Sequence, residues 1–255
     1  MKVSGLCARS CKPSAPMKLF RFLRALIVIP AALFLTLLIS LLTLFKTLVL
    51  RREAASVQGL AEWWARSICW VSGVEVAVTG IGQLDRAKPY IFAANHQSQF
   101  DILVLQGFLG VDFRWLAKKE LFRVFIWGPA MRRAGYIPID RSHGRQAIKS
   151  LDEAAQKIAA GTSVIIFPEG TRSKDGELHD FKAGAMVLAI KSGVPIVPVA
   201  ILGTYEILPK GKLLVTPGKV QVRVGHPIAT KHCSAKDKHE LARVSQEAVA
   251  DLLNK

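Results

Sequence analysis

The stretch YIFAANHQSQFD, residues 90–101, indicates an α/β fold because it joins a short apolar strand to a helix through a run of polar side chains. Residues 90–94 are apolar and short enough for a buried strand, and a helical stretch follows from Phe100. In α/β folds, ligands bind where the strands of the sheet run into the following helices. We therefore expect residues 95–101 at the functional edge of such a sheet.

Two of these residues, His96 and Asp101, form a candidate base and its orienting carboxylate. At their spacing they would lie about 140° apart around an ideal helix and could not meet. His96 should therefore precede the helix, with Asp101 in its first turn. Asp101 would then accept one imidazole N–H, which leaves the other ring nitrogen to take a proton from a hydroxyl. An isolated His and Asp at this spacing are more often structural than catalytic. A catalytic role therefore needs support from other parts of the chain.

Residues 73–255 alternate between β-rich and helical runs around this stretch, which indicates one α/β domain. We predict a mixed, largely parallel seven-stranded sheet flanked by helices. The expected strands are residues 74–79, 90–94, 114–117, 136–139, 164–167, 196–201 and 220–224. The expected helices are residues 100–110, 120–134, 144–160, 183–191 and 235–253. Pro195 and Pro198 would place the sixth strand at an edge of the sheet or at a bulge.

Further polar or basic groups follow three other expected strands. The segment FPEGTRS, residues 167–173, offers a glycine that lets the backbone approach an anion, and Arg172, which can bind a phosphate in two-pronged fashion. Another strand ends in Arg141, and a third is followed by Lys118 and Lys119. Polar clusters at the ends of more than one strand favour a ligand site over a set of solvated turns.

Residues 1–72 form a basic, hydrophobic region that we interpret as a helical membrane anchor. The first 60 residues carry nine basic side chains and one acidic one, in a chain with a formal net charge of +16. Residues 25–45 carry no charge and could form roughly 30 Å of helix, the thickness of a hydrocarbon core. This stretch fits a spanning helix or, if Pro30 divides it, a hairpin that enters one leaflet. The tryptophans in residues 53–72 suit either a membrane interface or packing on the domain.

Composition and missing motifs exclude several function classes. With 51% hydrophobic and 21% charged residues, the chain is too apolar for intrinsic disorder. The sequence contains no GxSxG, HExxH or P-loop motif, which argues against serine hydrolases, zinc peptidases and P-loop nucleotide binding. The basic excess adjoins an apolar run of membrane length instead of interleaved aromatic residues, so we expect no nucleic-acid partner. The four cysteines form no CxxC pair, which indicates a reducing compartment.

Four blocks of the sequence resemble, in order, the motif blocks of the 1-acyl-sn-glycerol-3-phosphate acyltransferases of the glycerolipid acyltransferase superfamily. The blocks are NHQSQFD at 95–101, GYIPIDR at 135–141, FPEGTRS at 167–173 and VPIVPVAI at 194–201. The resemblance implies transfer of a fatty acyl group from acyl-CoA or acyl carrier protein to the sn-2 hydroxyl of lysophosphatidic acid, giving phosphatidic acid. It implies no cofactor and no metal.

The resemblance also implies a role for each matching residue. His96 would be the general base, and Asp101 would orient it. The residues implied for binding the acceptor phosphate are Glu169, Gly170, Thr171 and Arg172, with Arg141 assisting. Lys118, or its neighbour Lys119, would stabilise the oxyanion formed from the thioester.

These inferences set the expected partners and location. We expect contacts with membrane lipids, lysophosphatidic acid and the acyl donor, with domain 73–255 on the cytoplasmic side of a bacterial inner membrane. Two alternatives stay open from the sequence. The acceptor could be another lysolipid, such as lyso-ornithine lipid or a lysophospholipid, or the chain could be a non-enzymatic membrane adaptor that keeps the blocks as a scaffold.

Overall fold

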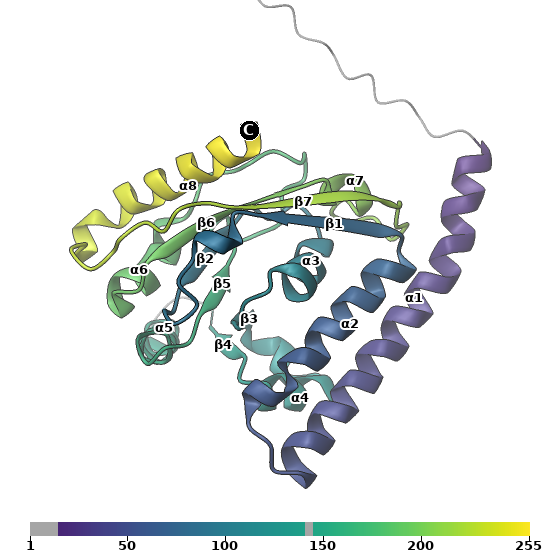
Figure 1. Cartoon of the computed structure of the whole chain (residues 1–255), viewed down its shortest axis with the longest axis horizontal. Helices are drawn as coiled ribbons and strands as arrows, with labels where there is room; N and C mark the ends of the chain where they lie inside the picture. The colour runs from purple at the N-terminus through teal and green to yellow at the C-terminus, as the bar shows by residue number, and fades with distance from the viewer. Residues whose placement is uncertain (1–14, 141–144) are drawn as a thin grey trace, which may run out of the picture.

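The computed structural model describes residues 15–140 and 145–255, with side chains described from residue 24 onward (Figure 1). Its centre is a seven-stranded sheet of order β1-β7-β6-β2-β5-β3-β4. Every neighbouring pair is parallel except β6 and β7, which confirms the predicted mixed, largely parallel sheet. The strands are β1 Val74–Thr79, β2 Ile91–Ala94, β3 Arg114–Lys118, β4 Ile137–Ile139, β5 Val164–Ile166, β6 Ile196–Leu202 and β7 Gly218–Val224.

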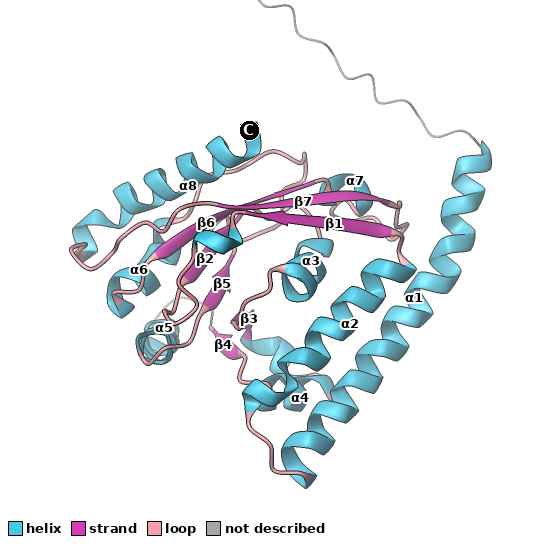
Figure 2. Ribbon diagram, in the orientation of Figure 1, coloured by secondary structure: helices cyan, strands magenta, loops and turns pink. Residues whose placement is uncertain are grey.

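Helices cover both faces of this sheet (Figure 2). The helices are α1 Ala15–Leu44, α2 Gln58–Val71, α3 Phe100–Phe108, α4 Trp127–Arg133, α5 Arg145–Ala159, α6 Ala183–Ser192, α7 Thr204–Ile207 and α8 Lys238–Asn254. The central strand β2 shows why both faces must be covered. Phe92 and Ala94 pack into the core under α3, whereas Ile91 and Ala93 pack with residues of α5, α6 and α8. A strand buried on both faces is apolar throughout, which is the pattern that the sequence shows.

The expected helix over residues 120–134 is wrong in its first half. Residues Lys119–Arg123 form a 3-10 turn, and α4 begins only at Trp127, after Ile126 with a φ of 63°. The chain folds back so closely that a Cβ added to Gly128 would lie 2.3 Å from the carbonyl oxygen of Phe122. This close approach depends on tertiary packing, so the helical spacing of the apolar residues did not reveal it.

The proline-containing strand β6 lies in the middle of the sheet, between β2 and β7. Pro198 has no backbone N–H to donate, and its nitrogen faces β7 at the point where the antiparallel ladder ends, at the Val199–Val224 pair. Beyond that pair Ile196 lies opposite Ile228, so the facing chain contains one extra residue over this interval. Of the two expected placements, the structure therefore has the bulge and not the edge.

The two N-terminal helices α1 and α2 form an antiparallel hairpin on one side of the domain (Figure 1). Of the two alternatives for this stretch, a division at Pro30 is wrong, because α1 continues through Pro30 and the chain turns back only at residues 50–53. Pro30 is exposed, so its ring points away from the packed face of α1. On that packed face the indole of Trp64 donates to the hydroxyl of Thr36 at 3.0 Å. Trp64 is therefore a packing residue, whereas Trp70 is 81% exposed.

Candidate active site

The site lies at the carboxyl ends of β2, β5 and β6, with His96 just after β2 and Asp101 in the first turn of α3. The imidazole Nδ1 of His96 lies 2.7 Å from Oδ2 of Asp101. Because a carboxylate only accepts hydrogen bonds, this contact assigns the ring proton to Nδ1 and leaves Nε2 as an acceptor. The pair therefore has the geometry of a base held by a carboxylate.

The carboxylate of Asp101 is fully buried, and both of its oxygens accept hydrogen bonds. In addition to the imidazole, Oδ2 accepts the backbone N–H groups of Gln97 at 2.7 Å and Ser98 at 2.8 Å. Oδ1 accepts the hydroxyl of Thr204, at the start of α7, at 2.5 Å. A buried charge is tolerated when it is hydrogen bonded in this way, and the contacts fix its orientation toward His96.

The loop that carries His96 is joined to the second polar loop, residues 167–173. The imidazole stacks on the ring of Phe167, with centroids 3.8 Å apart and planes at 11°. Glu169 accepts the backbone N–H of His96 at 2.6 Å and that of His179 at 3.4 Å, and Ser173 donates its N–H to the carbonyl oxygen of His96 at 2.7 Å. Burial raises the pKa of the Glu169 carboxyl, and the two backbone hydrogen bonds oppose that rise.

Glu169 is only 3% exposed, and both of its oxygens contact backbone N–H groups. In the same turn, Gly170 has a φ of 76°, a conformation that favours glycine, while Thr171 is exposed and Arg172 is half-buried. The turn therefore exposes Thr171 and buries Glu169.

The two candidate oxyanion lysines have different surroundings. Lys118 lines the same cavity as His96, and its side chain is 57% exposed. The ammonium of Lys119 instead lies 2.5 Å from the buried carboxylate of Asp140. The geometry thus favours Lys118 for contact with a substrate. Arg141 lies outside the described residues.

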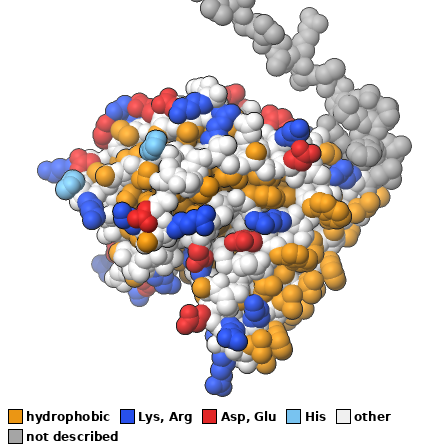
Figure 3. All heavy atoms as spheres, in the orientation of Figure 1, with side chains coloured by type: hydrophobic (Ala, Val, Ile, Leu, Met, Phe, Trp, Pro, Cys, Tyr) orange, Lys and Arg blue, Asp and Glu red, His pale blue; other side chains and the backbone are white. Residues whose placement is uncertain are grey.

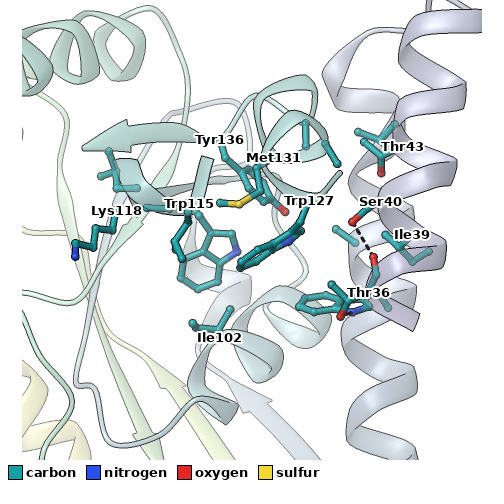
Figure 4. A pocket seen from close by; sticks show the side chains of 18 of the residues that line it. Thr36, Ile39, Ser40, Thr43, Ile102, Trp115, Lys118, Trp127, Met131 and Tyr136 are labelled. Carbon is teal, nitrogen blue, oxygen red and sulfur yellow. Dashed lines mark hydrogen bonds between the residues drawn. The ribbon is translucent and has the colours of Figure 1, made fainter. Parts of the chain in front are cut away.

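An apolar cavity of about 270 Å³ extends from His96 to α1 (Figure 4). The domain contributes mainly aromatic and apolar walls, namely Ile102, Trp115, Trp127, Met131, Tyr136 and Phe167. The α1 wall includes Thr36 and Ser40, whose hydroxyls donate to backbone carbonyl oxygens of their own helix at 2.7 Å. Burial raises the pKa of the Tyr136 hydroxyl, so this group lines the cavity in its neutral form. Apart from His96 and Lys118, the polar groups named on this wall are therefore neutral or hydrogen bonded within the chain, which suits a hydrocarbon chain.

The part of the chain that the structure describes contains no candidate metal site. Within residues 15–140 and 145–255, no group of three or more His, Cys, Asp or Glu side chains could hold a metal ion.

Comparison with known proteins identifies the family. A family model described as "Acyltransferase" matches residues 75–202, which is half of the chain and includes His96, Asp101 and the 167–173 turn. The chain belongs to this acyltransferase family. The matched region runs from β1 through β6, so it holds the strand ends that form the site.

The relatives of this acyltransferase are 1-acyl-sn-glycerol-3-phosphate acyltransferases, which confirms the group that the four blocks predicted. The chloroplastic enzyme of Brassica napus is 36% identical over 171 residues, covering 66% of this chain and 49% of the relative. The human alpha enzyme is 35% identical over 176 residues, covering 69% and 62%. The chain thus spans about half to three fifths of the length of these relatives.

A solved structure extends the similarity of this acyltransferase over nearly the whole chain. It is the crystal structure of the 1-acyl-sn-glycerophosphate acyltransferase of Thermotoga maritima, with a TM-score of 0.79 and 28% sequence identity. The match covers 93% of this chain and 97% of that one, so it includes an N-terminal helical part in addition to the sheet.

Sequence reasoning missed two groups of residues around this acyltransferase site. Thr204 and the basic Lys210 follow the fourth block, in a short helix and loop that carry no recognisable pattern. The residues of α1 that line the cavity were expected only as an anchor. No local signal distinguishes an apolar side chain facing substrate from one facing lipid.

Proposed function

We propose that this acyltransferase transfers a fatty acyl group from acyl-CoA or acyl carrier protein to the sn-2 hydroxyl of lysophosphatidic acid, giving phosphatidic acid. The observation that carries this proposal is the His96–Asp101 pair at the end of an apolar cavity. Arg172, whose chain neighbour Ser173 donates its N–H to the carbonyl oxygen of His96, supplies positive charge for a phosphate. The names of the relatives support the same acceptor.

The reaction follows from the geometry of the pair. Nε2 of His96 takes the proton from the sn-2 hydroxyl while that oxygen attacks the thioester carbonyl carbon. The C–S bond of the tetrahedral intermediate then breaks, and the leaving thiolate takes the proton back from the imidazolium. Asp101 stabilises the imidazolium between these two steps. Lys118 is the candidate that stabilises the negative oxygen of the intermediate.

Positioning contributes more than proton transfer in this scheme. General-base catalysis supplies roughly 10²- to 10⁴-fold, whereas good alignment of two reactants can remove about 7 to 11 kcal/mol of the barrier. In this proposal the acyl chain lies in the cavity, the acceptor phosphate binds Thr171 and Arg172, and Arg141 assists. Glu169 acts as a positioning residue, because its carboxylate holds the backbone of His96.

The Arg172→Ala variant should bind the acceptor more weakly. Loss of a charged hydrogen bond to phosphate is expected to raise KM for lysophosphatidic acid about tenfold to a hundredfold, with a smaller effect on KM for the acyl donor. Initial rates in mixed micelles at varied acceptor concentration measure this change. Lys157→Ala, which removes one exposed charge on α5, is the matched control. An unaltered acceptor KM in Arg172→Ala would rule out its role in phosphate binding.

The acceptor itself is tested by a panel of lysolipids. The full chain in detergent micelles receives labelled acyl-CoA or acyl carrier protein with lysophosphatidic acid, lysophosphatidylcholine or lyso-ornithine lipid, and thin-layer chromatography separates the products. We expect labelled phosphatidic acid. Product from another lysolipid alone would replace the proposed acceptor, and no product from any of them would favour the membrane adaptor.

We propose further that α1 lies in one leaflet, with the catalytic domain on the cytoplasmic side of a bacterial inner membrane. Arg24–Val49 is long and apolar enough to span a membrane. However, one face of α1 is buried on the domain from Ala25 to Thr43, while its other face exposes large apolar residues such as Leu33 and Phe34. Figure 3 shows hydrophobic side chains gathered along this side of the molecule. A spanning α1 would draw the polar surface of α2 and α4 into the hydrocarbon. The division at residue 72 into anchor and catalytic domain stays a prediction.

Protease protection distinguishes the two topologies. Epitope tags on Met1 and Lys255 should both be protected in sealed spheroplasts, and both should be cut after permeabilisation. Cleavage of the Met1 tag alone in sealed spheroplasts would contradict the single-leaflet arrangement.

A further inference from the structure

The segment Thr204–Lys210, which follows β6, contacts the site at three places. Thr204 donates its hydroxyl to Oδ1 of Asp101 at 2.5 Å. The carbonyl oxygen of Leu208 accepts a hydrogen bond from the hydroxyl of Ser98 at 2.8 Å, and Ser98 forms a β-bridge with Pro209. The ammonium of Lys210 lies 2.8 Å from both the hydroxyl oxygen of Thr171 and the carbonyl oxygen of Arg172. The segment therefore runs from the catalytic carboxylate to the turn that carries Arg172.

The charge on Lys210 has no counterion among the residues that the structure describes. Both of its hydrogen-bond acceptors are neutral, whereas the ammonium groups of Lys119 and Lys191 each meet a carboxylate. An ammonium has three N–H donors, and these two contacts use two of them. The third donor and the full positive charge are left at the edge of a turn that already contains a guanidinium.

We propose that Lys210 binds the phosphate of the acceptor together with Arg172. The two cations come from segments 38 residues apart, and the Lys210 side chain is held by the turn that it would serve. A phosphate dianion would supply the charge that the lysine lacks and accept its third N–H, while Arg172 contributes a planar fork. This inference deepens the proposed function and rests on it.

If Lys210 only braced the turn through its hydrogen bonds, its charge would not matter for binding of the acceptor. The variants therefore separate the charge of Lys210 from its hydrogen bonds. Lys210→Gln keeps an N–H donor for the turn but removes the charge, whereas Lys210→Arg keeps both. Lys212→Met removes an exposed charge from the same loop and is the matched control. All four proteins, including the unchanged one, are measured as full chains in detergent micelles.

The measurements are steady-state rates with lysophosphatidic acid and equilibrium binding of 1-acyl-propanediol 3-phosphate, an analogue without the reacting hydroxyl. We expect Lys210→Gln to raise the acceptor KM and the Kd of the analogue about tenfold or more, with kcat changed much less. Lys210→Arg should return both constants to within about threefold, and Lys212→Met should match the unchanged chain.

Each contrary outcome has a distinct meaning. If Lys210→Gln binds the analogue as tightly as the unchanged chain does, Lys210 is only a brace and the inference is overturned. The same conclusion follows if Lys210→Gln loses kcat while both constants stay the same. If the unchanged chain neither acylates lysophosphatidic acid nor binds the analogue, the proposed function fails as well.

Discussion

Replacing His96 with alanine should abolish acyl transfer while leaving acceptor binding intact. In the proposed mechanism the imidazole takes the hydroxyl proton, and no covalent enzyme intermediate offers another route. Loss of a general base costs roughly 10²- to 10⁴-fold in kcat. The backbone contacts of His96 with Glu169 and Ser173 do not involve its side chain, so the loops should keep their arrangement.

A second histidine provides the control for this variant. His179 also contacts a carboxylate, with its Nε2 3.0 Å from Asp175, but its side chain is half exposed. His179→Ala should therefore retain most of the activity. Turnover numbers from labelled product, together with binding of 1-acyl-propanediol 3-phosphate, measure the two effects separately. Turnover of His96→Ala close to that of the unchanged chain would refute its role as the base.

Asp101→Asn should lower kcat about tenfold to a hundredfold with little change in thermal stability. The asparagine oxygen can take the place of Oδ2 and accept the same donors, those of His96, Gln97 and Ser98. Its amide would then face Thr204, whose hydroxyl can rotate and accept in place of donating. The fold keeps its hydrogen bonds, but the imidazolium loses its negative partner, and charged hydrogen bonds of this kind contribute about 1.5 to 3 kcal/mol.

The matching control is Asp152→Asn, which removes a surface carboxylate paired with Lys191. Melting temperature by circular dichroism and kcat with saturating substrates should be compared for both variants. If Asp101→Asn keeps full activity, then the carboxylate only shapes the loop. If it unfolds, Thr204→Val offers a milder test, because it removes one donor from Asp101 and leaves the charge in place.

The sheet was predictable because its strands carry a strong local signal. Residues 91–94 are apolar in a run too short for a helix, and the structure buries alternate side chains of this run on opposite faces. The positions of His96 and Asp101 followed from helix geometry alone, since they cannot meet within one helix.

Other features depend on contacts between distant segments. Thr204 lies 103 residues from its partner Asp101, and nothing in the four residues of α7 indicates that contact. The break before α4 depends on Gly128 meeting the Phe122 carbonyl group. An apolar helix such as α1 looks the same in sequence whether it faces lipid or a cavity.

Because α1 forms part of the cavity wall, deleting it to obtain a water-soluble protein would also alter the cavity. Deleting residues 1–52 would remove Thr36, Ile39 and Ser40 from the wall along with the proposed membrane contact. A shortened chain of this kind would open the apolar cavity to bulk water, so poor turnover in it would say nothing about the proposed chemistry of His96. Detergents, nanodiscs or other lipid mimetics around the intact chain are the sound choice for purification.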